Sequence, residues 1–244
     1  MKVYGIIGFP LGHSFSQKYF TAKFIREGIE NCRYDVFPLQ DIADFPALLK
    51  ANPALCGLNV TIPHKQSVIP YLDDITNLPK DISACNCIKI NRGKLSGFNT
   101  DIIGFEKSLT PLLKQYHNKA LILGNGGAAE AVKFVLMKLG IAFKVVSRTL
   151  HNDSHLTYDN LNRQILDEHL LIINTTPLGT YPDVNYFPEI PYEYVSSRHY
   201  LFDLVYNPEK TIFLQKGAER GALIQNGYDM LLIQAEAGWD IWNS

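Results

Sequence analysis

The stretch KALILGNGGAAEAVKFVLMKLGIAFKVVSRT, residues 119–149, decides the fold class of this 244-residue chain. A short apolar run precedes a glycine-rich turn, an amphipathic helical segment follows the turn, and a second apolar run ends the stretch. This order of strand, tight turn, helix and strand is the setting in which the pattern G-x-G-x-x-G/A binds a dinucleotide. The stretch therefore predicts a Rossmann-type α/β domain.

The glycine turn matches that pattern through Gly124, Gly126 and the small residue Ala129. Gly124 permits the tight turn, Gly126 lets the backbone approach a pyrophosphate, and Ala129 lets the helix pack closely on the strand. The phosphates would lie at the helix N-terminus, where backbone N–H groups and the helix dipole favour an anion. The alternative is a glycine-rich turn between core elements that binds nothing. The flanking strand and helix favour the nucleotide site.

The end of the second strand indicates which dinucleotide is bound. Ser147, Arg148 and Thr149 stand there, with no Asp or Glu for the 2′-hydroxyl of an NAD adenine ribose. An arginine and two hydroxyls suit a 2′-phosphate through charge-assisted hydrogen bonds. We therefore predict NADP as the cofactor, the alternative being that Arg148 is simply solvated.

Length and composition exclude several classes of protein. A chain of 244 residues can form one large domain or two modest ones. With 46% hydrophobic and 19% charged residues and a net charge of −1, it is typical of globular proteins and lacks the basic character of a nucleic-acid binder. No apolar run approaches the ~20 residues of a membrane span, and Gly5, Gly8 and Pro10 interrupt the N-terminal one. We expect a cytoplasmic protein without nucleic-acid or membrane partners.

Metal and redox patterns are also lacking. The cysteines form no C-x-x-C spacing, so we expect free thiols. His151 and His155 are four residues apart but have neither a helical context nor a third ligand. We therefore expect no metal site.

A second α/β unit is predicted before residue 119, because apolar runs alternate there with helical stretches. The expected strands of the whole chain, besides those of the glycine-rich stretch, lie at residues 2–8, 32–39, 57–62, 84–91, 170–179 and 200–208. The expected helices lie at residues 16–29 and 41–52, with a closing amphipathic helix at 227–242.

The segment NVTIPHKQ, residues 59–66, ends one of these strands near a lysine. Its first four residues alternate polar and apolar side chains, as a half-buried strand does, and Pro63 stops the run. Taken alone, Lys65 is most simply a solvated charge, because lysine is mostly exposed. Motifs elsewhere in the chain are needed to give it a chemical role.

Several short motifs occur in the order and approximate spacing of the shikimate dehydrogenases: GFPLGHSFS, NVTIPHK, ACNCI, GFNTDIIGF, INTT, DLVYNP and GYDMLLIQ. The chain resembles that family over nearly its whole length. The resemblance implies a shikimate-binding catalytic domain, residues 1–100 together with 227–244, and a Rossmann-like NADP-binding domain, residues 101–226. The active site would be the cleft between these domains.

The resemblance gives Lys65 and Asp101 a catalytic role, because they match the paired lysine and aspartate of the family. Oxidising a secondary alcohol requires loss of the hydroxyl proton as hydride departs, and the reverse reaction requires an acid. The lysine charge also stabilises the oxygen anion. Which of the two accepts the proton stays open, because a coupled pair has shared pKa values.

The resemblance also implies the ligand contacts. The substrate residues are all neutral hydrogen-bonding groups, as a polyhydroxylated acid requires: Ser14, Ser16, Asn59, Thr61, Asn86, Tyr206 and Gln234. The NADP residues are Gly124, Asn125, Gly126, Gly127, Ala128, Ser147, Arg148, Thr149, Thr175, Leu204 and Gly227. Taken singly, Ser14 and Ser16 also suit helix N-caps, and Asn86 suits a turn.

Some features depart from the family pattern. The region between Thr149 and Ile172 is short, so we expect a trimmed helix in the nucleotide domain. His151 and Asn152 stand where relatives often have a second basic residue, and Leu204 replaces a common methionine. These departures leave the strictness of NADP preference open.

The sequence thus predicts an NADP-dependent shikimate dehydrogenase, an oxidoreductase of chorismate and aromatic amino-acid biosynthesis that interconverts 3-dehydroshikimate and shikimate. It would act on its small-molecule substrate as a monomer or homodimer. One alternative is a quinate/shikimate dehydrogenase of broader substrate and cofactor use. The other is a non-catalytic NADP-binding sensor, against which the retention of both Lys65 and Asp101 argues.

Overall fold

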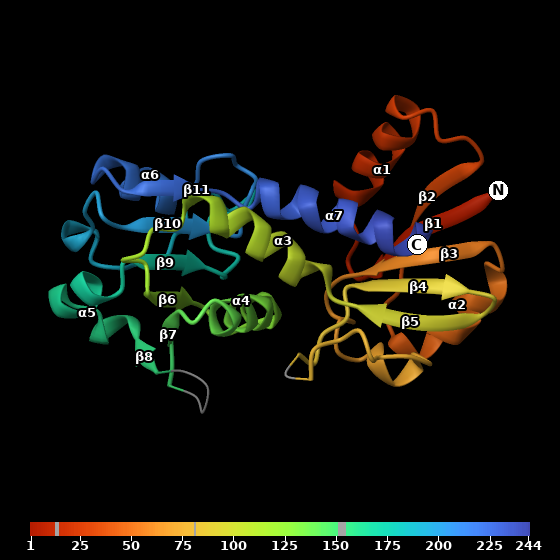
Figure 1. Cartoon of the computed structure of the whole chain (residues 1–244), viewed down its shortest axis with the longest axis horizontal. Helices are drawn as coiled ribbons and strands as arrows, with labels where there is room; N and C mark the ends of the chain where they lie inside the picture. The colour runs from red at the N-terminus through yellow and green to blue at the C-terminus, as the bar shows by residue number, and fades with distance from the viewer. Residues whose placement is uncertain (13–14, 81, 151–154) are drawn as a thin grey trace. The chain divides into compact units, whose positions relative to one another are not determined.

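The chain forms two compact α/β units, each with its own β-sheet (Figure 1). The computed structural model describes residues 1–12, 15–80, 82–150 and 155–244. One unit contains residues 1–100 and 235–244, and the other contains residues 101–234. The predicted α/β fold class with a Rossmann-type sheet is confirmed.

The first unit has a five-stranded sheet in the order β2-β1-β3-β4-β5. The strands β1 (Lys2–Gly8), β2 (Cys32–Pro38) and β3 (Leu55–Val60) are parallel, and β4 (Cys87–Asn91) and β5 (Lys94–Phe98) add an antiparallel hairpin. Because β2 and β3 flank β1, a topological switch point lies between β1 and β3. Open α/β sheets bind ligands outside the carboxyl ends of strands at such a point.

Helices α1 (Phe15–Arg26) and the C-terminal part of α7 (Tyr228–Asn243) cover one face of this sheet. Their aromatic side chains pack on the fully buried Tyr4, whose ring stacks on Trp242 with centroids 5.1 Å apart. The Trp242 indole N–H also donates to the carbonyl of Ile88 at 3.0 Å, so its polar atom is satisfied inside the core.

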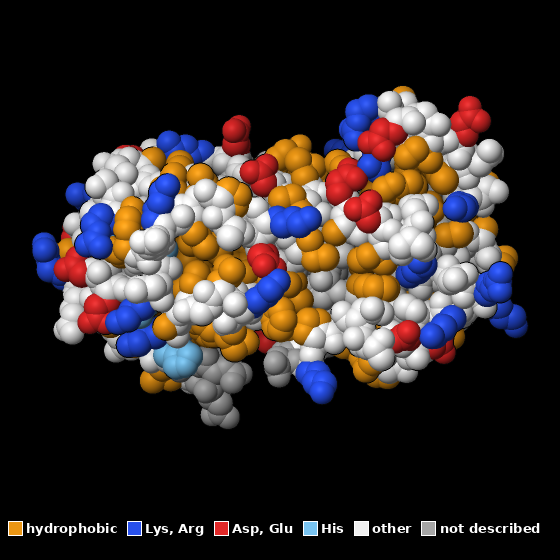
Figure 2. Space-filling view, in the orientation of Figure 1, with side chains coloured by type: hydrophobic (Ala, Val, Ile, Leu, Met, Phe, Trp, Pro, Cys, Tyr) orange, Lys and Arg blue, Asp and Glu red, His pale blue; other side chains and the backbone are white. Residues whose placement is uncertain are grey.

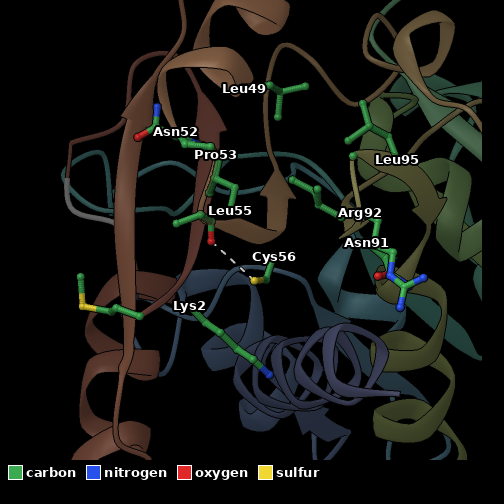
Figure 3. Close-up of a pocket in the computed structure, with 13 residues that line it drawn as sticks. Lys2, Leu49, Asn52, Pro53, Leu55, Cys56, Asn91, Arg92 and Leu95 are labelled. Carbon is green, nitrogen blue, oxygen red and sulfur yellow. Dashed lines mark hydrogen bonds between the residues drawn. The ribbon is translucent and has the colours of Figure 1, made fainter.

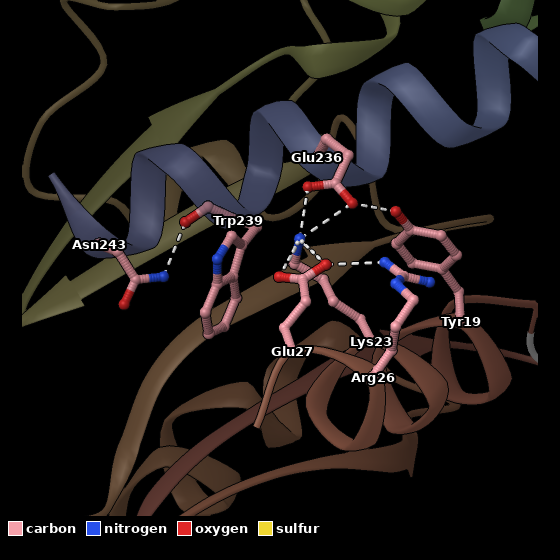
Figure 4. A network of polar contacts seen from close by, with 7 residues as sticks. All are labelled: Tyr19, Lys23, Arg26, Glu27, Glu236, Trp239 and Asn243. Atoms are coloured by element: carbon pink, nitrogen blue, oxygen red, sulfur yellow. Dashed lines mark hydrogen bonds and ion pairs between the residues drawn. The ribbon is translucent and has the colours of Figure 1, made fainter. Parts of the chain in front are cut away.

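A polar network ties α1 to α7 within the first unit (Figure 4). The Lys23 ammonium lies 2.7 Å from the Glu236 carboxylate and 3.0 Å from that of Glu27, with its side chain only 6% exposed. Burial alone would lower the pKa of Lys23, but the hydrogen bonds to both carboxylates raise it above the usual value. The Tyr19 phenol donates to Glu236 as well, so four side chains hold these two helices together.

The opposite face of the sheet carries the 3-10 turns η1 (Ile42–Asp44) and η2 (Ile69–Tyr71) and helix α2 (Phe45–Ala51). The single helix predicted over residues 41–52 is therefore wrong in its first turn. Pro46 has no backbone N–H to donate to the carbonyl four residues earlier, so the α-helical ladder begins only at α2.

The second unit has a six-stranded, fully parallel sheet in the order β11-β10-β9-β6-β7-β8. Its strands are β6 (Lys119–Leu123), β7 (Ala142–Ser147), β8 (Leu156–Thr157), β9 (Leu171–Asn174), β10 (Tyr200–Asp203) and β11 (Leu223–Gln225). In chain order this is the 3-2-1-4-5-6 arrangement of doubly wound dinucleotide-binding sheets. Its switch point lies between β6 and β9, beside the glycine turn.

Strands β9 and β10 are buried along their whole length, as expected when helices cover both faces of a parallel sheet. The remaining helical elements are α3 (Thr100–Leu109), η3 (Thr110–Leu112), α4 (Gly127–Lys138), η4 (Tyr158–Asn160), α5 (Arg163–Glu168), η5 (Tyr192–Tyr194) and α6 (Ile212–Glu219). Helix α5, in the region where the sequence predicts a trimmed helix, has 6 residues.

Charged side chains of both signs are interspersed over the face in view (Figure 2). This distribution agrees with the formal net charge of −1. Within the described ranges, no helix is both long and apolar enough to cross a bilayer.

Candidate active site

The carboxyl edge of β1 and β3 gathers the predicted substrate residues of the first unit. Asn59 lies on β3, Thr61 follows it, and Asn86 directly precedes β4, whose start pairs with the end of β3. Ser16 is buried in the first turn of α1, the helix that follows β1. Ser14 lies outside the described residues. Ser16, Asn59, Thr61 and Asn86 therefore lie where the topology favours a ligand.

A buried chain of hydrogen bonds joins three of these residues through Tyr34 of β2. The Tyr34 phenol donates to Asn59 Oδ1 at 2.7 Å and is also hydrogen-bonded to the Ser16 hydroxyl. The Asn59 amide in turn donates to the Asn86 carbonyl at 3.4 Å. Burial raises the pKa of Tyr34 well above its usual value, so the phenol keeps its proton at neutral pH.

Asn86 connects this edge to the start of α3. Its Oδ1 accepts from the backbone N–H of Thr100 at 2.6 Å, and its Nδ2 donates to the Thr100 hydroxyl at 3.0 Å. Both residues are buried. The side chain of Asn86 thus binds the segment in which Asp101 follows Thr100, a structural role in addition to the predicted contact with substrate.

Lys65 stands in the turn after β3, and its main chain is held in place. Its carbonyl accepts from the N–H of Cys85 at 2.7 Å. The preceding His64 is buried, and its Nε2 lies 2.6 Å from the carbonyl of Leu39, so this nitrogen carries the proton. The Lys65 side chain is partly exposed, as is that of Asp101, the first residue of the second unit.

A separate pocket of about 500 Å³ lies at the amino-terminal edge of the same sheet (Figure 3). It is lined by the start of β1, the start of β3 and the turn between β4 and β5, with Lys2, Cys56 and Arg92 among its residues. None of the predicted substrate residues that the structure describes lines this pocket. It lies at the opposite ends of β1 and β3 from the predicted site.

In the second unit, the turn after β6 requires glycine at its first position. Gly124 has a φ of +104°, and a Cβ there would lie 2.9 Å from Thr175 Oγ1. The backbone N–H and the hydroxyl of Thr175 both donate to the carbonyl of Leu123 at 2.9 Å. The predicted tight turn at Gly124 is present, and Thr175 lies against it.

The next residues of the turn leave room for a ligand. Gly126, Gly127 and Ala128 are exposed, and a Cβ added at either glycine would have no atom within 4 Å. Gly126 has an ordinary φ of −90°, so neither strain nor packing within the chain explains glycine there. A diphosphate at the start of the 12-residue helix α4 would use that space and the backbone N–H groups of the first helical turn. The turn therefore fits a dinucleotide.

A lysine absent from the sequence prediction lies beside this turn. The Lys133 ammonium lies 2.7 Å from Asn125 Oδ1 and 2.9 Å from the Glu130 carboxylate, and its side chain is 15% exposed. Lys133 thus holds Asn125 and offsets the negative charge that Glu130 brings to the first turn of α4.

The segments after β9, β10 and β11 also meet at this edge. The N–H of Leu204 donates to the carbonyl of Asn174 at 3.0 Å, and a Cβ at Gly227 would lie 2.2 Å from the Leu204 carbonyl oxygen. Gly227 is therefore required for close approach to Leu204. Tyr206 is exposed two residues further on, whereas Gln234 is buried on α7. The structure thus brings Thr175, Leu204 and Gly227 to one edge of the sheet.

Asp203, at the end of β10, is a buried carboxylate that the sequence did not single out. It accepts hydrogen bonds from Asn174 Nδ2 at 2.9 Å, the N–H of Val205 at 3.0 Å and the Thr211 hydroxyl at 2.6 Å. Burial raises the pKa of Asp203 to about 6 despite these three donors.

The residues predicted for the 2′-phosphate stand at the end of β7. The Ser147 hydroxyl donates to the Thr149 carbonyl, and Arg148 is exposed. Burial raises the pKa of Tyr158 to about 12, and the positive charge of Arg148 opposes this rise. His151 and Asn152 lie outside the described residues.

Comparison with known proteins identifies the family. Residues 6–88 match the family described as "Shikimate dehydrogenase substrate binding domain". An NADP-dependent shikimate dehydrogenase from Methanococcus maripaludis is 37% identical over 99% of this chain and 91% of its own length. The chain belongs to the shikimate dehydrogenase family.

Solved structures of shikimate dehydrogenases share the fold. One, in complex with NADP+, is 32% identical with a TM-score of 0.86, covering 99% of this chain and 89% of its own. Another, from Thermus thermophilus in complex with NADP(H) and shikimate, is 29% identical with a TM-score of 0.86 over 99% and 93% of the two chains. The predicted family, an NADP-dependent oxidoreductase, is confirmed.

The sequence analysis assigned no role in the site to Tyr34, Lys133 or Asp203. Tyr34 reads as an ordinary core aromatic, because period-2 alternation shows only which face of the strand it occupies. Lys133 could have been found, since a lysine on the second turn of the helix after the glycine turn is close to Asn125 by helical geometry. Asp203 ends an apolar strand, where a carboxylate signals either a solvated loop or a buried hydrogen-bonded group.

Proposed function

We propose that this chain catalyses the reversible, NADP-dependent reduction of 3-dehydroshikimate to shikimate, in chorismate and aromatic amino-acid biosynthesis. The main supporting observation is the chemistry at the carboxyl edges of the two sheets. One edge gathers buried hydroxyl and amide groups and carries Lys65 in the turn after β3, and the other presents an open glycine turn followed by Arg148 one strand later. Both edges lie at topological switch points.

The substrate-binding role is assigned to residues 1–100 together with 227–244, and to Tyr206 outside these ranges. Ser14 and Ser16 would hold the carboxylate, and Asn59, Thr61, Asn86, Tyr206 and Gln234 would surround the ring hydroxyls and the carboxylate. All are uncharged donors and acceptors. Such a site discriminates strongly for hydroxylated rings, because an analogue lacking a hydroxyl leaves buried polar groups unpaired.

Lys65 and Asp101 would hold and move the proton of the reacting hydroxyl. The hydrogen bond of the Lys65 carbonyl to Cys85 fixes the backbone of one, and Asn86 fixes the segment that carries the other. The ammonium of Lys65 would also stabilise the negative charge that develops on the oxygen. When bound, NADP supplies the hydride acceptor or, as NADPH, the donor.

The cofactor-binding role is assigned to residues 101–226 and to Gly227 directly after them. Gly124, Asn125, Gly126, Gly127 and Ala128 would hold the diphosphate, and Ser147, Arg148 and Thr149 the 2′-phosphate. Thr175, Leu204 and Gly227 would line the nicotinamide end. An exposed arginine beside two hydroxyls favours NADP over NAD, because a guanidinium forms strong bidentate hydrogen bonds with phosphate.

Steady-state kinetics with shikimate and quinate, each with NADP and NAD, tests this function. We expect the highest kcat/KM with shikimate and NADP. Comparable values for quinate or NAD would support the broader quinate/shikimate dehydrogenase. Tight NADP binding without oxidation of either acid would favour a sensor and contradict the proposal.

The proposal also covers the cellular location and the oligomeric state of the enzyme. We infer that it acts in the cytoplasm, as a monomer or homodimer. Cell fractionation with an antibody to the chain tests the location. Sedimentation over a range of protein concentrations tests the oligomeric state.

A further inference from the structure

We propose that Tyr34 is a positioning residue of the substrate edge, whose phenol proton fixes the side-chain amide of Asn59 as a hydrogen-bond donor toward the ligand. The identity of that ligand, a polyhydroxylated carboxylic acid, rests on the proposed function. The orientation of the Asn59 amide does not depend on the proposed function, because it follows from contacts within the first unit.

Packing holds the phenol in one place. Tyr34 is 4% exposed, and its ring stacks on Phe20 with centroids 4.8 Å apart and an interplanar angle of 13°. The Trp242 ring lies 6.4 Å from it. Since the ring cannot move, the position of the phenol oxygen is fixed and only its O–H bond can rotate.

The proton of that O–H has one destination. Asn59 Oδ1 lies 2.7 Å away and can only accept, so the phenol donates to it. The phenol has no second proton, so in its hydrogen bond with Ser16 it is the acceptor and the serine hydroxyl is the donor. Tyr34 therefore remains bound to Asn59 whichever way the Ser16 hydroxyl turns.

The amide of Asn59 is fixed in the same way. One N–H of its Nδ2 points to the Asn86 carbonyl at 3.4 Å. Turning the amide over would place Oδ1 against that carbonyl oxygen and leave the phenol without its acceptor. The second N–H of Nδ2 is then the group that Asn59 can donate to the ligand. A ring hydroxyl oxygen or a carboxylate would be a suitable acceptor.

Tyr34→Phe removes the phenol oxygen and keeps the ring, so it tests this role directly. We expect KM for shikimate to rise about tenfold, the effect of leaving one buried acceptor without its donor. We expect kcat to stay within about threefold and KM for NADP to be unchanged, because the substitution affects substrate binding alone.

A second measurement needs no enzymatic activity. In ¹⁵N-labelled protein, the side-chain amide signals of Asn59, assigned by their loss in Asn59→Asp, report the hydrogen bonds of that amide. Tyr34→Phe should shift both signals and speed their exchange with water. If the parent did not oxidise shikimate, the proposed function would fail, whereas these signals would still decide how the amide is held.

Two comparisons separate positioning from loss of stability. Phe45→Leu removes a fully buried ring from the core on the opposite face of the sheet, so it should lower Tm and leave KM for shikimate unchanged. In an Asn59→Ala background, Tyr34→Phe should add little to the rise in KM. An equal rise in KM for Phe45→Leu and Tyr34→Phe would overturn the proposal. Unchanged amide signals or an unchanged KM in Tyr34→Phe would overturn it as well.

Discussion

Asn174 donates a hydrogen bond from its side-chain amide to the carboxylate of Asp203 at 2.9 Å, and both residues are completely buried. Asn174 Oδ1 accepts from the N–H of Thr176 at 3.0 Å and from its hydroxyl at 2.6 Å. Asp203 accepts from the N–H of Val205. One buried pair thus fixes the segment beside the glycine turn and the loop that follows β10.

Asp203→Asn should destabilise the protein by ~1–3 kcal/mol, because an amide nitrogen would face one of the three donors that the carboxylate now accepts from. Urea denaturation measures the loss. Asp183→Asn, at an exposed position, is the matched control and should change the free energy of unfolding by less than ~0.5 kcal/mol. Equal stability of Asp203→Asn and the parent would contradict the role of the pair.

The same carboxylate predicts a pH dependence. The pKa of Asp203 is about 6 in the folded protein against 3.8 ordinarily, so the folded state binds its proton more tightly. Its contribution to stability is fully present below pH ~4 and is lost as pH rises through ~6, amounting to ~2–3 kcal/mol at most. The stability advantage of the parent over Asp203→Asn should therefore be larger at pH 4.5 than at pH 7. An advantage that grows with pH would show that the carboxylate is preferentially ionised in the fold.

The catalytic pair predicts strongly coupled mutants. Lys65→Ala should lower kcat by ~10²–10⁴-fold, with a smaller effect on KM, because a positioned acid–base group is lost. Asp101→Ala should also lower kcat, and the double mutant should lose much less than the product of the single effects. Lys50→Ala, at an exposed position of α2, is the control and should behave like the parent. Strict additivity would mean that the two residues act on different steps.

Cofactor preference should depend on Arg148. Arg148→Ala should weaken NADP binding by roughly 1.5–3 kcal/mol and leave NAD nearly unchanged, since only NADP carries the 2′-phosphate. Added salt should weaken NADP binding more in the parent than in the mutant, because exposed charges are screened. Arg220→Ala, at the end of α6, is the control. Equal loss of both cofactors in Arg148→Ala would remove the 2′-phosphate assignment.

Lys133 should affect both cofactors alike. Lys133→Ala leaves Asn125 unsupported and the Glu130 charge uncompensated beside the glycine turn. Because NAD and NADP share the diphosphate, titration should show their affinities falling by a similar factor, about tenfold. Glu130→Gln should raise both affinities slightly. A selective loss of NADP would place Lys133 at the 2′-phosphate instead.

Local patterns were enough to predict most of the framework. Buried parallel strands read as continuous apolar runs, and a strand is present at each of the expected positions 2–8, 32–39, 57–62, 84–91, 170–179 and 200–208. The strands expected at 170–179 and 200–208 end five residues earlier than predicted, at Asn174 and Asp203. The short strands β5, β8 and β11 were not predicted. Two or three residues carry too little periodicity for β8 and β11 to be recognised.

The buried hydrogen-bonded side-chain pairs within each unit could not be predicted from apolar patterns along the sequence. Tyr34 and Asn59 are 25 residues apart, and they meet only because β2 and β3 flank β1. Asn174 and Asp203 meet because β9 and β10 are neighbours. Strand order sets such pairs, and apolar periodicity shows which residues form a strand but not which strands are adjacent. The roles of Lys65 and Asp101 came from family resemblance and stay predictions.

The most direct test of the central claim follows the transferred hydride itself. Shikimate carrying deuterium on the carbinol carbon that is oxidised is incubated with NADP and the protein, and both products are analysed by mass spectrometry. We predict one deuterium in NADPH for each 3-dehydroshikimate formed, and loss of this transfer in Lys65→Ala. NADP binding without labelled NADPH, or 3-dehydroshikimate formed without transfer of deuterium to the cofactor, would contradict the assignment of this chain as a shikimate dehydrogenase.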